Sequence, residues 1–179
     1  MAGWIDAYVA LEAEVQATMR SLCSAHCTSC GRPCCREVFC RESLESAFLA
    51  RIRRAEGGHA YGARTGWLGP RGCRLEAGRP CVCYEFICPR ILRRLSGGSQ
   101  LAANALSEIV TSVGRSALGS QHLLALDGRQ LRRVRAARML ARIEAGFAAL
   151  EACRRVLGGA GPTGADMAAL ARVDEDASL

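Results

Sequence analysis

The sequence contains no lysine and few aromatic residues. All 24 residues counted as basic are arginines, which against 17 acidic residues give a formal net charge of +7, while aromatic residues make up 5%. Grooves for single-stranded nucleic acid combine basic and aromatic side chains, so this composition argues against such a groove. The guanidinium fork suits phosphate oxygens, but the charge excess is moderate. Because alanine and glycine are abundant, a GC-rich genome is the simpler explanation for the exclusive use of arginine.

The chain also lacks the features of a secreted or membrane-spanning protein. Asp6, Glu12 and Glu14 lie where a signal peptide has a basic start followed by an uncharged apolar run. No stretch reaches the roughly 18 uninterrupted apolar residues of a membrane span. We therefore expect a cytoplasmic protein with no membrane segment, in a compartment that keeps thiols reduced.

Cysteine, in contrast, is abundant and concentrated. Ten of the eleven cysteines form two groups, Cys23, Cys27, Cys30, Cys34, Cys35 and Cys40 in the first, and Cys73, Cys81, Cys83 and Cys88 in the second. The total is odd, and adjacent cysteines or cysteines one residue apart suit ordinary disulfide geometry poorly. In a reducing compartment this density is typical of metal coordination, so all ten are candidate metal ligands. Cys153 lies apart, on an apolar helical stripe, and is expected to be a small buried hydrophobic residue.

The spacing within the two groups suits coordination by sulfur. Cys27 and Cys30 enclose two residues, which lets a loop turn back and place two sulfurs on one ion. The second group supplies four further thiols, as many as a tetrahedral site requires. A site with ligands from both groups would close the loop over residues 41–72 and stabilise a half that has little apolar core of its own.

Part of this pattern resembles a known family. The segment Cys27-Thr-Ser-Cys30-Gly-Arg-Pro-Cys34-Cys35, followed by Gly72-Cys73 and by the run from Cys81-Val-Cys83-Tyr84 to Cys88-Pro89, is similar to the CxxCxxCC family of zinc- or iron-chelating domains, often called YkgJ-like. The resemblance covers residues 23–95. It implies these ligands: Cys27, Cys30, Cys34, Cys35, Cys73, Cys81, Cys83 and Cys88. The gap between Cys30 and Cys34 is one residue longer than in the family motif, and Cys23 and Cys40 are additional to it.

The number of cysteines favours one metal over the other. An all-sulfur zinc site uses four ligands per ion, so this many cysteines suit two ions or a cluster with bridging thiolates. An iron–sulfur cluster would use four cysteines and leave several idle. Zinc is therefore favoured, with an iron–sulfur cluster as the alternative. Cys23, Cys27 and Cys30 also have the spacing with which radical-SAM enzymes hold a cluster, but the chain is too short for the barrel of those enzymes and has no clear nucleotide-binding loop.

The apolar periodicity predicts a mainly α fold that begins with an amphipathic helix. This helix is expected over residues 4–22, and a shorter one from about residue 43, ending before residue 57, with Leu44, Phe48 and Ile52 on one side. Residues 59–72 are rich in glycine and predict a loop, with a short hairpin near Tyr61 or Trp67.

The second half predicts an antiparallel helical hairpin. One helix carries an apolar stripe over residues 101–113, and a second, long helix opens with the capping pair Asp127 and Gln130 and stops before Gly158. The second helix is expected to present an apolar stripe to a partner, with Leu131, Val134, Met139, Ile143, Phe147, Leu150 and Leu157. A short turn would join the two helices.

The chain is accordingly divided into three parts within one compact unit. Residues 1–95 form a metal-stapled, cysteine-rich region with an N-terminal helix and irregular loops. Residues 99–158 form the helical hairpin, and residues 159–179 form a short helix, with Met167, Leu170 and Val173 as its apolar positions, and a frayed tail.

The sequence shows no Ser-His-Asp set, phosphate loop or carboxylate pair that demands catalysis. We expect a structural zinc-binding protein whose helical half engages a protein partner or a second copy of the chain. The alternative is an iron–sulfur protein in electron transfer or in a redox or methyl-transfer modification system. Nucleic-acid binding is less favoured: arginines of the second helix are expected to form a solvated face, namely Arg132, Arg135, Arg138 and Arg142.

Overall fold

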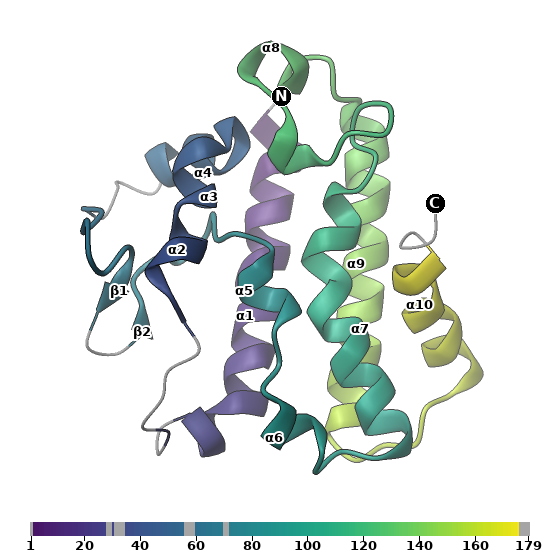
Figure 1. Cartoon of the computed structure of the whole chain (residues 1–179). Helices are drawn as coiled ribbons and strands as arrows, with labels where there is room; N and C mark the ends of the chain where they lie inside the picture. The colour runs from purple at the N-terminus through teal and green to yellow at the C-terminus, as the bar shows by residue number, and fades with distance from the viewer. Residues whose placement is uncertain (1, 28–29, 31–34, 56–59, 70–71, 176–179) are drawn as a thin grey trace.

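The structure is mainly α-helical, as the periodicity predicted. The computed structural model describes residues 2–27, 30, 35–55, 60–69 and 72–175. Its longest helices, α1 (Ala2–Cys27), α7 (Gly97–Gly114), α9 (Ala136–Leu157) and α10 (Gly164–Glu175), lie side by side (Figure 1). Within the described ranges, no helix combines the length and apolar character needed to cross a membrane.

Shorter elements connect these helices. They are α2 (Glu37–Cys40), α3 (Glu42–Glu45), α4 (Ala47–Ala55), β1 (Leu68–Gly69), β2 (Gly72–Cys73), α5 (Val82–Glu85), α6 (Pro89–Leu92), the 3-10 turn η1 (Leu123–Ala125) and α8 (Gly128–Leu131). β1 and β2 pair antiparallel, with Leu68 opposite Cys73. This hairpin lies in the predicted loop and directly follows Trp67, one of the two places where a hairpin was expected. With α2 and α3 it forms a small lobe beside the long helices (Figure 1), and α4 packs into the main core through Phe48, Leu49 and Ile52.

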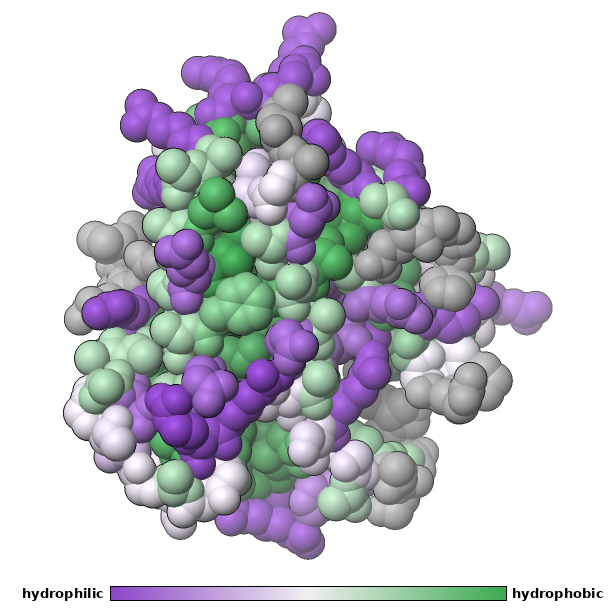
Figure 2. All heavy atoms as spheres, turned by 180° about the vertical axis from the view of Figure 1, so that it is seen from behind, coloured by the Kyte–Doolittle hydropathy of each residue, from purple (hydrophilic) through white to green (hydrophobic). Residues whose placement is uncertain are grey.

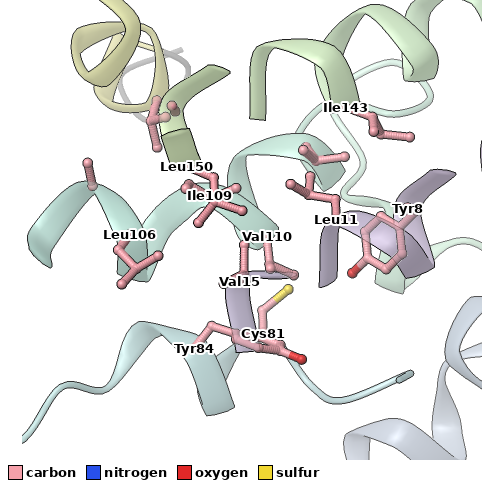
Figure 3. Packing of buried hydrophobic residues seen from close by; sticks show 14 of the residues in the cluster. Tyr8, Leu11, Val15, Cys81, Tyr84, Leu106, Ile109, Val110, Ile143 and Leu150 are labelled. Atoms are coloured by element: carbon pink, nitrogen blue, oxygen red, sulfur yellow. The ribbon is translucent and has the colours of Figure 1, made fainter. Parts of the chain in front are cut away.

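The main core is built around α1. As its periodicity predicted, Trp4, Tyr8, Leu11 and Val15 are buried, and the helix continues to Cys27, five residues beyond the predicted end. α1 packs on both α7 and α9. Figure 3 shows the side chains of Leu11 and Val15 among those of α7 and α9. One continuous hydrophobic cluster therefore joins residues of the cysteine-rich half to residues of the helical half.

The second helix of the hairpin starts as predicted and then stops. The Asp127 carboxylate accepts hydrogen bonds from the backbone N–H groups of Arg129 and Gln130 at 2.7 and 2.8 Å, and the Gln130 side chain accepts one from the Asp127 N–H, which completes a capping box. α8 nevertheless ends at Leu131. The prediction of one long helix joined to its neighbour by a short turn is wrong, because residues 115–135 form a connection that contains η1 and α8.

The apolar stripe of the hairpin packs within the chain. α1 lies on α7 and α9, and α10 lies on both as well, so Met139, Ile143 and Leu150 are buried. Phe147 is an exception, since 36% of it is exposed. In α10, Leu170 and Val173 are buried, whereas Met167, the third apolar position expected there, is 43% exposed. The prediction of fraying from Asp174 is wrong at its start, because α10 continues to Glu175; residues 176–179 lie outside the described residues.

The predicted helix near residue 43 is divided in two. Ser46 adopts an extended conformation between α3 and α4. Phe48 and Ile52 of α4 are buried as expected, but Leu44 of α3 is 42% exposed, so its predicted place on the buried side is wrong. Ser43 takes the interior position, because its hydroxyl donates to the Cys40 carbonyl at 2.6 Å and accepts a hydrogen bond from the indole N–H of Trp67 at 2.7 Å.

Candidate metal centre

Three cysteines from two other segments of the chain interact with the Cys83 side chain. Loss of hydration raises the pKa of Cys83 to about 12, although the residue as a whole is exposed; the thiol of Cys73 adds to the shift, the Arg79 guanidinium opposes it, and the thiols of Cys35 and Cys40 add to it. Cys83 belongs to α5, Cys73 to β2 and Cys40 to the end of α2, while Cys35 precedes α2. The two cysteine groups of the sequence therefore meet here.

The lobe around this place has a very small core of its own. Cys40, Trp67 and Leu75 are its buried residues, with Tyr61 and Cys73 packed against them. The ring of Tyr61 meets that of Trp67 edge to face, with centroids 5.1 Å apart. A cluster of this size contributes little hydrophobic stabilisation.

The turn before β1 approaches the Cys40 sulfur closely. Gly66 has a φ of +57°, and a Cβ atom on it would lie 2.7 Å from the Cys40 Sγ. Any other residue would therefore clash with the thiol and would also strain the backbone. Glycine at this position is what allows the loop to cover Cys40.

Cys81 points away from this group. Residues two apart on a helix project about 200° from each other, so the thiols of Cys81 and Cys83 face opposite sides of α5. Cys81 lies in the main core, with its sulfur directed toward α7 near Val110 (Figure 3). Burial raises the pKa of Cys81 to about 12, although a hydrogen bond with Thr111 opposes the shift. Cys81 and Cys83, two predicted ligands with one residue between them, therefore lie on opposite sides of α5.

A hollow of about 320 Å³ adjoins Cys81 at the junction of the two halves. Glu42, Glu85 and His122 line it together with Thr111. His122 Nδ1 accepts a hydrogen bond from the Leu124 N–H at 3.2 Å, so Nε2 is the donor to the Thr111 carbonyl at 3.1 Å. Because backbone groups occupy both ring nitrogens, His122 has a structural role here.

The remaining predicted ligands lie near the end of α1 or near α6. Cys23 and Cys88 are half-buried and pack against the main core, whereas Cys27 and Cys30 are exposed. The N–H of Cys30 donates to the Cys27 carbonyl at 3.2 Å. Cys34 lies outside the described residues. Cys153 is fully buried, as the sequence indicated, and its thiol donates to the Ala102 carbonyl at 3.2 Å.

The segment that carries Cys83 is fastened to α1 by a buried carboxylate. Glu12 has no exposed surface, and it accepts hydrogen bonds from the backbone N–H groups of Gly78 and Arg79, both at 2.9 Å, and from the Tyr84 hydroxyl at 2.6 Å. Burial raises the pKa of Glu12, while these hydrogen bonds lower it in part. Gln16 adds a bond to the Glu76 carbonyl at 3.1 Å. Sequence reasoning missed this role, because an acidic residue on an amphipathic helix is ordinarily solvated.

The donor set around Cys83 suits a soft metal in its chemistry. Among residues whose placement the structure gives, no three Cys, His, Asp or Glu side chains lie close enough to hold an ion as they stand, and no disulfide joins any two of the ten described cysteines. Thiols that coordinate a metal lose their protons, and the metal supplies the positive charge that balances them. Zinc or an iron–sulfur cluster would supply that positive charge, with Cys35, Cys40, Cys73 and Cys83 as the nearest described ligands.

Comparison with known proteins adds no identification. No family model, no curated protein and no solved structure matches the chain. The resemblance to the CxxCxxCC family therefore rests on the residues and spacing of the cysteines and remains a prediction.

Proposed function

We propose that this chain is a metal-binding protein in which zinc, held by cysteine thiolates, has a structural role. The observation that carries the proposal is the electrostatic interaction of Cys83 in α5 with Cys73 of β2 and with Cys35 and Cys40 at α2. An ion at this place would tie the lobe to α5, and α5 is attached to the long helices through Tyr84 and Glu12. A structural role follows because the lobe has only a small core of its own to hold it in place.

The similarity of the cysteine spacing to the CxxCxxCC family supports the same proposal, as does the chemistry of the donors. Sulfur-only sites of this kind are typical of structural zinc. We place this function in the cytoplasm, where cysteines stay reduced and available to a metal.

The test is elemental analysis together with a visible absorption spectrum of protein purified without oxygen. We expect zinc in a whole-number ratio to the chain and no visible band. Cys83→Ser should lose zinc, while the matched control Cys153→Ala should retain it, because Cys153 is buried between helices far along the chain. If the protein contained iron and sulfide and absorbed in the blue region, the bound group would be an iron–sulfur cluster and not zinc. Metal-free protein that is unaffected by Cys83→Ser would contradict both.

The helical half supplies the surface for a partner in this proposal. Leu140 and Phe147 of α9 are 38% and 36% exposed, and seven residues along a helix return to nearly the same face. Figure 2 shows hydrophobic side chains reaching the surface among hydrophilic ones on the side opposite to Figure 1. A protein partner or a second copy of the chain would cover such positions. Light scattering after size-exclusion chromatography tests the second copy: a dimer that Phe147→Ser converts to monomer is the expected result, and a monomer at all concentrations leaves a different protein as partner.

A further inference from the structure

The hollow beside Cys81 is lined by both acidic and apolar side chains. Glu42 lines it from α3 and Glu85 from α5, while Leu124 and Ala125 line it from η1. In Figure 1, α5 lies between the lobe and α7, so the hollow is built where the two halves of the chain meet. Its volume of about 320 Å³ is at the lower end of the roughly 300–1,000 Å³ of small-molecule clefts. This size suits a small molecule with a short apolar part.

Neither carboxylate of the hollow, Glu42 or Glu85, forms an ion pair with any residue whose position the structure gives. Burial raises the pKa of Glu42, and the Glu85 carboxylate raises it further. His122 does not balance their charge, because burial lowers its pKa and leaves the imidazole neutral near pH 7. Arg115, the arginine that acts on His122, does not line the hollow and pairs with Glu108 at 2.6 Å. Two acidic side chains around one concave site create a negative potential that favours a cation.

The hydrogen-bond donors that line the hollow are already occupied. The Thr111 hydroxyl donates to Glu85 Oε1 at 2.7 Å. Because this hydroxyl has one proton, it accepts its second hydrogen bond, from the protonated thiol of Cys81. His122 uses both ring nitrogens in bonds to the backbone. Glu85 Oε2 and the Glu42 carboxylate, in contrast, accept no side-chain or backbone hydrogen bond within the described ranges, so the hollow offers acceptors to a ligand.

We propose that this hollow binds a small aliphatic amine as its ammonium ion. An ammonium group is a compact charge with three donors that reach acceptors on different elements, whereas a planar guanidinium suits a single carboxylate. Glu42 and Glu85 come from two elements, which matches the ammonium. Hard metal ions take about six or more oxygen ligands, and a pair of carboxylates beside an occupied imidazole and a protonated thiol supplies too few. Leu124 and Ala125 provide apolar surface for the alkyl part.

Calorimetric titration of the full-length protein with n-butylamine, at neutral pH and fixed ionic strength, tests the proposal. Glu42→Gln is the main variant and Glu85→Gln the second, because the amide keeps the size of the side chain and removes its charge. Glu144→Gln is the matched control, since Glu144 is an exposed acidic residue of α9 that does not line the hollow and its replacement changes the net charge equally. Each lining variant should weaken amine binding about tenfold, which is the loss of one charge-assisted hydrogen bond. The control should bind as the unaltered protein does.

Two further ligands define the class of cation. n-Butanol, which has the same alkyl chain without the charge, should not bind, and magnesium chloride at the same concentration should not displace the amine. Absence of saturable n-butylamine binding, equal weakening by Glu144→Gln, equal affinity for n-butanol, or displacement by magnesium would overturn the proposal. The melting temperature of each lining variant should be no lower than that of the unaltered protein, because a like charge is removed. Zinc content should be the same in all three variants, so this result is independent of the metal proposal.

Discussion

Replacing Glu12 by alanine is expected to destabilise the protein by about 3–5 kcal/mol, because hydrogen bonds to a charged group are lost and their buried donors are left without an acceptor. The Glu12 carboxylate accepts three hydrogen bonds, from Gly78, Arg79 and Tyr84, at 2.6–2.9 Å. Hydrogen bonds to a charged group contribute about 1.5–3 kcal/mol each, and a buried donor left without an acceptor costs about 1–3 kcal/mol. Part of the loss is offset because the variant no longer buries a carboxylate.

The measurement is urea unfolding followed by circular dichroism, with the free energy of unfolding taken from the midpoint and slope. Glu14→Ala is the matched control, because Glu14 lies on the same helix but is half-exposed and pairs with Arg154 at the surface. Exposed ion pairs contribute at most about 1 kcal/mol. If Glu12→Ala destabilised the protein no more than Glu14→Ala does, the attachment of residues 76–84 to α1 through this carboxylate would be refuted.

Three further results are expected. Burial lowers the pKa of His122, so the stability that this residue contributes should be complete above the unfolded pKa of about 6.5. It should be lost as the pH falls from there toward the lower folded pKa, with a slope of at most about 1.4 kcal/mol per pH unit. His122→Asn should flatten that part of the stability–pH curve, and an unchanged curve would contradict the assignment. A Cβ at Gly146 would lie 2.8 Å from Leu11 Cδ2, so Gly146→Val should lower the free energy of unfolding by about 1–3 kcal/mol, measured by thermal or urea unfolding. The loss should be smaller when Leu11→Ala is also present, and strict additivity of the two substitutions would exclude this contact as the cause. Removal of metal by a chelator should lower the melting temperature and change the fluorescence of Trp67, measured in a Trp4→Phe background, because Trp67 packs beside Cys40 and Cys73. If the Trp67 fluorescence did not respond, the metal would not be bound in the lobe.

Much of the fold follows from local patterns. The apolar spacing of α1, the capping box at Asp127 and the end of α9 before Gly158 are all properties of a few adjacent residues, and the structure confirms them. The break between α8 and α9 carries no such signal, because residues 131–136 contain neither glycine nor proline. Leu131 and Val134 are both buried there, and the tighter turn that places them inside is favoured by packing and not by local propensity.

The candidate site shows the same division. Cysteine abundance and spacing indicate coordination by sulfur, because thiol chemistry belongs to the residues themselves. The spacing of Cys81 and Cys83 does not reveal that they face opposite sides of a helical turn. It also does not reveal that Cys35, Cys40 and Cys73, from other segments of the chain, interact with Cys83. Those relations depend on how α5 is seated against α7 and against the lobe.

The sequence by itself determined that this protein is mainly helical and rich in thiols, and that Cys153 is a core residue, since each of these depends on residue type and short-range periodicity. Only the tertiary structure decided that α1 covers the helical hairpin, that Glu12 is buried as a hydrogen-bond acceptor, and that Glu42 and Glu85 share a hollow. Such contacts join residues that are far apart in the chain, as Glu12 and Tyr84 are with a separation of 72. The physical reason is that burial and electrostatic pairing are set by which surfaces meet in space, and a local pattern does not contain that information.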